Sequence, residues 1–215
     1  MEKICIIIDS SNFYNLVLKK LDIQDVDFNF ESFANFLANG REIIKEGKRF
    51  YVATVRENVE GKNAMTNQTM LFSGLIKSGN WRILTSKLKT RTETIKIDKR
   101  VLNYENILKS GTKELTYTRS REKGIDVKIA VDLIIGALDN KYETAILVSS
   151  DTDLIPALDL VRFRFKKKVE YIGFSLPRTE IYEETKPVPR MIGKTDIQRV
   201  LVKSDIEPFI LKKLL

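Results

Sequence analysis

Histidine is absent from this sequence of 215 residues, and cysteine occurs only once. Without imidazole, the chain can build neither a Ser-His-Asp catalytic triad nor a histidine-based zinc site. A single cysteine also excludes an intramolecular disulfide and a cluster of thiolate metal ligands. That residue, Cys5, lies in an apolar run, so we interpret it as a small core residue. Hydrolytic chemistry in this chain would therefore rest on carboxylates, hydroxyls, lysines and hard metal ions.

Long hydrophobic runs are absent as well. The longest candidates, Ile4–Ile8 and Ala145–Val148, have the length of strands and fall far short of the roughly 20 apolar residues of a membrane span. The chain starts Met1-Glu2-Lys3 and enters a strand at once, which leaves no room for a signal peptide. We therefore expect a cytoplasmic protein that does not bind a membrane.

Acidic residues are fewer than basic ones, 29 against 37, which gives a net charge of +8. Most of the excess lies in residues 87–123, where eleven basic residues stand against five acidic ones. A basic surface favours polyanionic partners through counterion release, so nucleic acid is the expected partner. This segment would track a phosphate backbone with cations that include Arg119, Arg121 and Lys123. The alternative is a solvated hairpin.

Apolar runs alternate with helical patterns along most of the chain, which is typical of an α/β fold with helices on both faces of a parallel sheet. Five strands are expected, at Lys3–Asp9, Arg49–Val55, Arg82–Thr85, Thr144–Ser149 and Lys168–Ile172. The segment at about 87–122 does not fit this repeat, because its residues alternate between polar and apolar. We expect an exposed β-hairpin or excursion there.

Residues 1–174 are expected to form one domain, since 43% of the chain is hydrophobic and its length suits a single core. Residues 175–215 hold Pro177, Pro187 and Pro189 and then two short helical patterns, around Asp196–Val202 and Asp205–Leu215. We interpret them as a helical extension packed on the same domain.

Four aspartates fall at the carboxyl ends of the expected strands. Asp9 closes the first strand and Asp126 begins the helix that leads into the fourth. Asp151 and Asp153 follow the fourth strand. Ligands of open α/β sheets bind at this edge, and if the first and fourth strands are neighbours, the carboxylates converge. Like charges that close repel unless a cation neutralises them, and oxygen ligands suit Mg²⁺ or Mn²⁺.

Each of these aspartates also has a simpler interpretation as a helix N-cap, and the two roles are compatible. Asn12 lies one helical turn beyond Asp9 and can face the same crevice. Asp132 lies about 240° around its helix from Asp126, so we expect it behind the site at most. The neighbouring serines are candidates to contact phosphate, although serine is also common in turns: Ser10, Ser149 and Ser150.

Three segments, in this order, resemble the signatures of NYN domains, and most closely those of the LabA-like branch. Ile8–Tyr14 is similar to the opening I-D-x-x-N-x-Y signature. Lys123–Val127 resembles K-G-[VI]-D-V, and Ile146–Pro156 resembles S-x-D-[ST]-D-[FL]-x-P. The resemblance covers about Lys3–Gly173. One departure is Ser150, which stands where a glycine is frequent.

The resemblance implies the PIN-like nuclease superfamily, with a three-layer, Rossmann-like fold and a mostly parallel five-stranded sheet in the order 3-2-1-4-5. It also implies a ribonuclease site that depends on Mg²⁺ or Mn²⁺, with single-stranded RNA as the preferred substrate. The residues that would hold the metal are Asp9, Asp126, Asp151 and Asp153, with Asn12 orienting beside them.

Our functional hypothesis is hydrolysis of phosphodiester bonds by a water that the metal activates. A non-catalytic nucleic-acid-binding or regulatory module is the main alternative. A nucleotide-sugar transferase with a D-x-D metal site at Asp151–Asp153 is weaker, because it leaves Asp9 and Asn12 unexplained. A homodimer, and a protein partner bound through residues 175–215, stay open.

Overall fold

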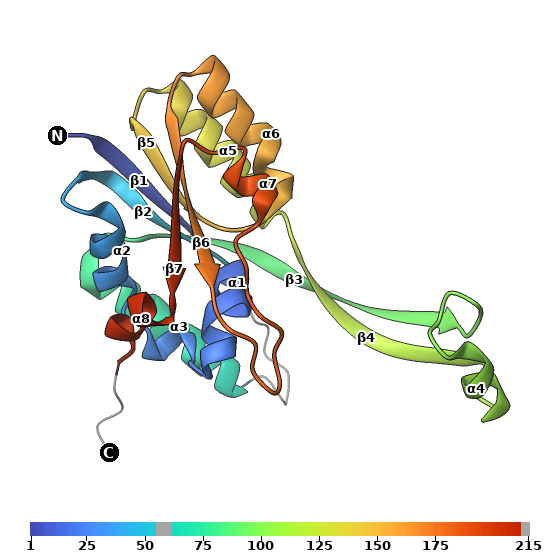
Figure 1. Ribbon diagram of the computed structural model, residues 1–215. Coiled ribbons are helices and arrows are strands. Elements are labelled where there is room, and N and C mark those ends of the chain that lie inside the picture. Colours follow the sequence, from blue (N-terminus) through green and yellow to red (C-terminus); the bar gives the residue numbers. More distant parts are fainter. Residues whose placement is uncertain (55–61, 212–215) are drawn as a thin grey trace.

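Seven strands form one sheet in the computed structural model, which describes residues 1–54 and 62–211. The order across the sheet is β4-β3-β2-β1-β5-β6-β7 (Figure 1). The strands are β1 Lys3–Asp9, β2 Glu42–Thr54, β3 Arg82–Lys96, β4 Glu114–Lys123, β5 Thr144–Val148, β6 Lys168–Ser175 and β7 Ile197–Val202. All pairs are parallel except β3 with β4, which is antiparallel.

The centre of the sheet follows from its most apolar segments. Ile4–Asp9 of β1 are all buried, as is every residue of β5. The two strands pair in parallel from Ile4 with Thr144 to Ile8 with Val148. A strand covered on both faces has no polar side, so it must read as a continuous apolar run.

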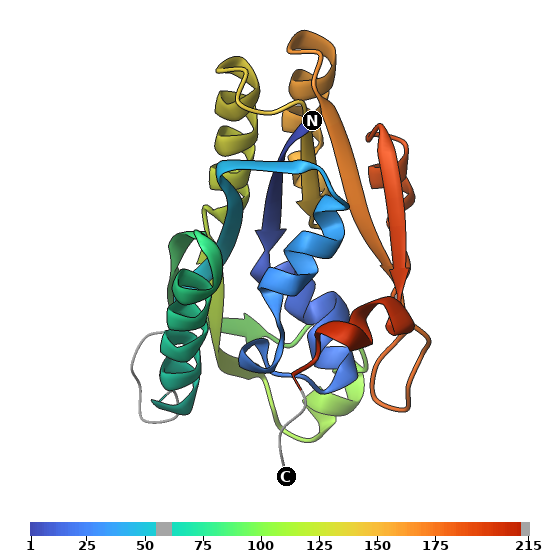
Figure 2. The ribbon, with the colours of Figure 1, turned by 90° about the vertical axis from the view of Figure 1, so that its left-hand side faces the viewer.

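Helices cover both faces of the sheet, which gives three layers (Figure 2). They are α1 Ser10–Phe13, α2 Phe30–Ala38, α3 Lys62–Gly79, α4 Tyr104–Lys109, α5 Ile125–Leu138, α6 Ile155–Asp159, α7 Pro189–Ile192 and α8 Lys203–Ile206. Successive side chains of a strand point to opposite faces. Ile4, Ile6 and Ile8 therefore pack with α1, α2, α3 and α8, whereas Cys5 and Ile7 pack with α5, α6 and α7.

The prediction of five strands was wrong, because one additional strand lies at each edge of the sheet. The five expected strands are neighbours, as β3-β2-β1-β5-β6, but the sheet as a whole has six parallel strands and one antiparallel strand. The helix expected at Asp196–Val202 is instead β7, which pairs with β6 from Glu170–Ile197 to Ser175–Val202. The extension 175–215 thus contributes a strand to the sheet as well as short helices.

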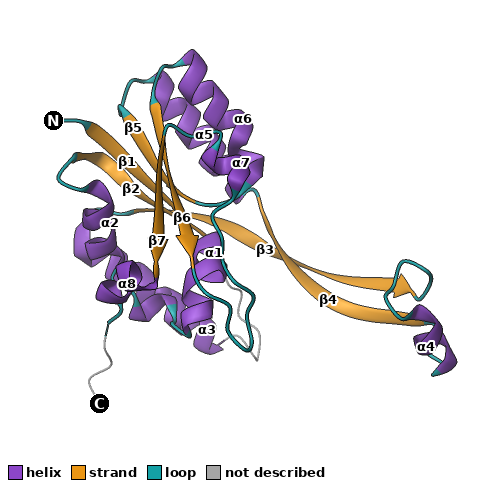
Figure 3. Cartoon of the chain, viewed as in Figure 1, coloured by secondary structure: helices purple, strands orange, loops and turns teal. Residues whose placement is uncertain are grey.

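The basic segment forms an arm that projects from the body, with α4 at its outer end (Figure 3). Within the described residues, β3 pairs with β2 as far as Lys87, and from there outward its partner is β4. The antiparallel pairing runs from Lys87–Lys123 to Lys96–Glu114. The expected excursion is therefore a long hairpin that continues the sheet beyond the core.

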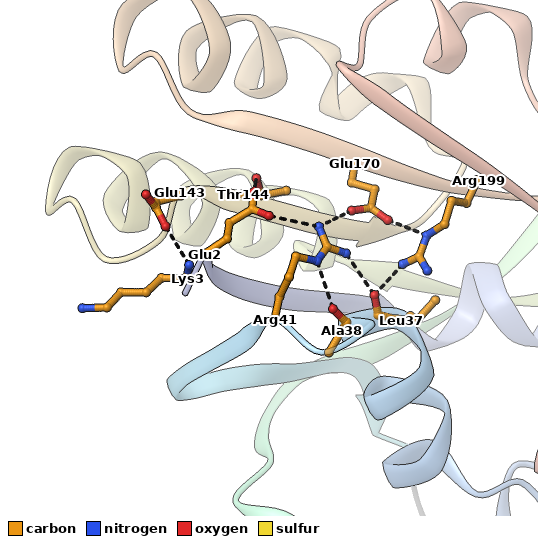
Figure 4. A network of polar contacts seen from close by, with 9 residues as sticks. All are labelled: Glu2, Lys3, Leu37, Ala38, Arg41, Glu143, Thr144, Glu170 and Arg199. Carbon is orange, nitrogen blue, oxygen red and sulfur yellow. Dashed lines mark hydrogen bonds and ion pairs between the residues drawn. The ribbon is translucent and has the colours of Figure 1, made fainter.

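A polar network holds the amino ends of the strands together (Figure 4). Glu170 of β6 is 1% exposed and lies between Arg41 Nη1 at 2.7 Å and Arg199 Nε at 2.5 Å. Both arginines also donate to the carbonyl oxygen of Leu37, at 3.0 and 2.6 Å, at the carboxyl end of α2. This network joins α2, β6 and β7 on the sheet face that carries α2.

No helix in the described part of the chain combines the length and the apolar character that crossing a membrane requires.

Candidate active site

Asp9 is fixed at the carboxyl end of β1 by hydrogen bonds to both of its carboxylate oxygens. It is the N-cap of α1, where Oδ1 accepts from the backbone N of Asn12 at 3.1 Å. Oδ2 accepts from the hydroxyl of Ser149 at 3.1 Å. The residue is only 5% exposed. Asp9 is therefore a helix cap, as the simpler interpretation proposed, and at the same time a carboxylate held rigidly at the ligand-binding edge of the sheet.

Asn12 connects the end of β1 to the end of β5. Its side-chain Oδ1 accepts from the backbone N of Ser150 at 3.0 Å. The Ser150 hydroxyl in turn lies 2.8 Å from the hydroxyl of Tyr171 on β6. The segments after β1 and β5 are thus held in register by side chains that the sequence placed far apart.

Ser149 is buried, at 1% exposure, and bridges two aspartates. Its hydroxyl donates to Asp9 and accepts from the backbone N of Asp151 at 3.2 Å. Asp151 is the N-cap of the short helical turn Thr152–Leu154, and its Oδ1 accepts from the backbone N of Asp153 at 2.9 Å. The structure thus gives the Ser149 hydroxyl a role in positioning the Asp9 carboxylate and the Asp151 backbone, and its burial leaves no open surface for phosphate.

Three of the four predicted aspartates line one pocket of 290 Å³. They come from three different elements: Asp9 from β1, Asp126 from the first turn of α5, and Asp151 from the segment after β5. Gly124, in the left-handed conformation with φ +87°, makes the turn from β4 into α5 that brings Asp126 to this edge. The other lining residues are Ser11, Asn12, Asn15 and Leu16. Asp153 is exposed and does not line the pocket.

The pocket suits a hard divalent cation by the chemistry of its donors. Three carboxylates and two side-chain amides supply the oxygen ligands that Mg²⁺ and Mn²⁺ prefer. Their spacing is more open than that of an assembled cluster: within residues 1–54 and 62–211, no three Asp, Glu, His or Cys side chains form a group that could hold a metal. The donor set therefore fits such a cation in kind, without a preformed cage.

Asp132 lies behind this edge and ties α5 to β2. The Tyr51 hydroxyl donates to its Oδ2 at 2.5 Å, and Arg49 Nη1 lies 3.9 Å from the same oxygen. Burial, followed by this hydrogen bond, raises the pKa of Tyr51 above its ordinary range. Tyr51 is the register partner of Asp9 in the sheet. Asp132 thus supports the strand beside Asp9.

The other residues that were predicted to contact nucleic acid differ in their exposure to solvent. Ser10 is buried, at 4% exposure, whereas Ser150 is half-buried at the rim. Arg119, Arg121 and Lys123 belong to β4, at the side of the arm, and their side chains lie outside the described residues.

A second polar pocket, of 300 Å³, was not foreseen from the sequence. Its lining comes from segments without a shared motif: Tyr14, Gln24, Asp25, Val26, Val52, Asn67, Gln68 and Leu71. Oδ1 of Asp25 is buried and has no hydrogen-bond partner among the described residues. Burial raises the pKa of this carboxyl from 3.8 to about 6. No local sequence signal identifies such a site, because only the tertiary structure brings these residues together.

The buried carboxyl of Asp25 predicts a pH-dependent stability. Its folded pKa of about 6 lies above the ordinary 3.8, so between these values the folded state binds more protons than the unfolded state. Stability therefore falls as pH rises through this window, and the penalty is complete at pH 7. We expect Asp25→Asn to raise the free energy of unfolding by about 3 kcal/mol at pH 7 and by less than about 1 kcal/mol at pH 4. Urea denaturation at both pH values measures this difference, and an equal gain at both would contradict it.

Asn12 predicts a second, smaller effect on stability. Asn12→Ala leaves the backbone N of Ser150 without its partner, so we expect a loss of about 1–2 kcal/mol in urea denaturation. Asn15→Ala is the matched control, because Asn15 lines the same pocket but is exposed and bonds only to Ser11 O within its own helix. Equal losses in both variants would show that the hydrogen bond between Asn12 and Ser150 adds no more stability than the local bond of Asn15.

Comparison with known proteins identifies the family of this chain and a solved structure with a similar fold. The profile of the NYN domain matches residues 3–187. No curated protein matches the chain. Among solved structures, the chain is similar to a protein of unknown function from Vibrio parahaemolyticus, with 18% identity, a TM-score of 0.55 and coverage of 95% of each chain. At this identity the likeness shows the fold alone.

Proposed function

Because this chain belongs to the NYN domain family, we propose that it is a metal-dependent nuclease that hydrolyses phosphodiester bonds of single-stranded RNA. The family implies a PIN-like nuclease fold; the LabA-like branch is part of the proposal. The observation that carries the proposal is the pocket at the carboxyl edge of the sheet, where Asp9, Asp126 and Asp151 meet from three separate elements. Aspartates that served only to stabilise the fold would not need to line one open pocket from three different elements.

Each residue of the pocket has a definite role in this proposal. Asp9, Asp126 and Asp151 would hold Mg²⁺ or Mn²⁺, with Ser149 fixing the carboxylate of Asp9 and the backbone of Asp151. A bound divalent cation supplies a Lewis acid for the phosphodiester and makes a nearby water more acidic. With no histidine in the chain, the attacking water gives its proton to a pocket carboxylate or to solvent. The bond from phosphorus to the 3′-oxygen breaks and this oxygen takes a proton from solvent, so the products carry a 5′-phosphate and a 3′-hydroxyl.

The arm provides a surface that can bring RNA to this pocket. β4 runs along the arm and ends at Lys123, three residues before Asp126. Basic side chains along the described part of the arm include Lys87, Arg91, Lys96, Lys99, Lys109 and Lys113. Such a row attracts a phosphate backbone and steers it by charge.

A non-catalytic nucleic-acid-binding module is the second candidate function. The open spacing of the carboxylates favours it, because no three acidic side chains of the described residues form a preassembled cluster. The D-x-D transferase interpretation receives no support, since Asp151 lines the pocket and Asp153 does not.

Cleavage of end-labelled single-stranded RNA with Mg²⁺ or Mn²⁺, with and without a chelator, separates the two candidates. A nuclease cuts only when the metal is available and leaves 5′-phosphate ends. Binding of the same RNA without any product, in both metals and across structured and unstructured sequences, would establish the binding module instead.

A further inference from the structure

The unforeseen polar pocket adjoins the carboxylate pocket through one short stretch of chain. Tyr14 lines the polar pocket, while the next two residues, Asn15 and Leu16, line the carboxylate pocket. Val52, on β2, places the polar pocket near the same edge of the sheet, because Asp9 pairs with Tyr51 there. A nucleic acid strand in the carboxylate pocket would thus pass close to its entrance.

The lining combines apolar walls with convergent polar groups. Val26, Val52 and Leu71 contribute the apolar surface. The polar groups are the Asp25 carboxylate, the Tyr14 hydroxyl and three side-chain amides, from Gln24, Asn67 and Gln68. Gln68 is held in place because its Nε2 donates to the carbonyl oxygen of Ala53 at 2.9 Å. Sites for small planar ligands have this composition, in which apolar walls hold the ring and a few polar groups fix its edge.

The Asp25 carboxylate is the group of this pocket whose hydrogen bonding is incomplete. Its Oδ1 is buried without a hydrogen-bond partner among the described residues. Buried acceptors are almost always satisfied, and an exception calls for a missing donor. Tyr14 lies within electrostatic reach, because burial and then the Asp25 charge raise the pKa of its hydroxyl. A ligand that enters the pocket and presents a hydrogen-bond donor would complete this carboxylate.

We propose that this pocket binds a nucleobase that carries an exocyclic amino group, which means adenine, cytosine or guanine, and that it discriminates against uracil. This inference rests on the proposed function for its substrate class. An amino group donates to Asp25 Oδ1, whereas uracil presents two carbonyl oxygens on either side of its single N–H, and a carboxylate repels them. RNA is commonly recognised in this way, with unstacked bases read at their hydrogen-bonding edges and packed against aromatic rings. Tyr14, which lines the pocket, would supply such a ring.

Binding without cleavage tests this inference. Fluorescence anisotropy with oligoadenylate, oligocytidylate and oligouridylate of equal length is measured in chelator for the wild type, Asp25→Asn and Asp22→Asn. Asp22→Asn is the matched control, because it removes one exposed charge from the same segment outside the pocket. The ratio of affinities for two oligonucleotides cancels the general effect of charge on phosphate binding.

The wild type and the control should bind oligoadenylate or oligocytidylate about tenfold more tightly than oligouridylate, and Asp25→Asn should reduce this ratio to near one. A wild type without preference, or a preference that survives in Asp25→Asn, would overturn the proposal. Circular dichroism checks that Asp25→Asn folds, as its expected gain in stability implies, and Asn67→Ala is a second variant of the lining that should reduce the same ratio.

The outcome is independent of catalysis. A preference that depends on Asp25, in a protein that cleaves no RNA, would leave the base pocket standing and remove the nuclease proposal. Metal-dependent cleavage by a protein that binds all three oligonucleotides equally would support the nuclease proposal and remove the base pocket.

Discussion

Asp9→Asn is expected to reduce metal-dependent RNA cleavage on the order of 100-fold or more. Asparagine caps helices as well as aspartate does, so the bond to the Asn12 backbone N is kept. Its amide has no charge with which to hold a cation. Its amide nitrogen cannot accept from the Ser149 hydroxyl as Oδ2 does, so the free energy of unfolding should fall by about 1–2 kcal/mol. This loss leaves the protein folded, and the substitution therefore separates the two roles of this residue.

Asp151→Asn should behave like Asp9→Asn, because Asp151 also caps a helical turn and lines the same pocket. Asp153→Asn should cost much less, since its side chain lies outside the pocket. Asp139→Asn, at the far end of α5, controls for the loss of one negative charge. Initial rates at several Mn²⁺ concentrations, with urea denaturation of each variant, give all the comparisons.

Wild-type rates in both Asp9→Asn and Asp151→Asn would remove the support for the carboxylate pocket and point to a contaminating nuclease. A loss in Asp153→Asn as large as the other two would show that the metal draws in a fourth carboxylate when it binds. That result would favour the convergence of four aspartates that the sequence predicted.

Glu170→Leu is expected to lower the free energy of unfolding by about 3–5 kcal/mol. The substitution removes the carboxylate that Arg41 and Arg199 share, and their side chains are only 18% and 25% exposed. Arg41 keeps only the more distant Glu2 carboxylate, at 3.8 Å. Removal of one member of a buried ion pair is costly because the remaining charge stays buried without compensation. Guanidinium chloride denaturation measures the loss.

Glu143→Leu is the control at the same edge of the sheet. Glu143 is exposed and accepts one hydrogen bond from the backbone N of Lys3 at 2.7 Å, so its removal should cost less than about 1.5 kcal/mol. A second comparison is the double variant Glu170→Leu with Arg199→Leu. It should lose less stability than the two single losses combined, with a coupling of about 0.5–3 kcal/mol. A loss below 1 kcal/mol in Glu170→Leu alone would mean that the two arginines rehydrate freely.

Local sequence patterns predicted the centre of the sheet well, and for a physical reason. β1 and β5 are buried on both faces, so nearly every residue must be apolar, and such runs stand out without any knowledge of their partners. The strand β7 gave no such signal. Its buried and exposed positions alternate on one edge of the sheet, and it was read as a helix because only its pairing with β6 defines it.

The candidate site also has features that the sequence predicted and features that it could not predict. Asp9, Asp126 and Asp151 were assigned to one edge from the sequence, because a parallel topology collects the residues that follow its strands. The exclusion of Asp153 could not be foreseen, since it depends on the turn that Asp151 caps. Ser149 was expected to face a ligand, yet it is enclosed between two aspartates by a contact that spans most of the chain.

The sequence by itself determined the family, the alternation of strands and helices, and the edge at which the carboxylates gather, because each of these follows from local patterns. Only the tertiary structure decided the outer strand β7, the ion pairs of Glu170 with two arginines and the unsatisfied carboxylate oxygen of Asp25. These depend on burial and on partners distant in sequence, and the strength of a charge or a hydrogen bond is set by the surroundings that folding creates.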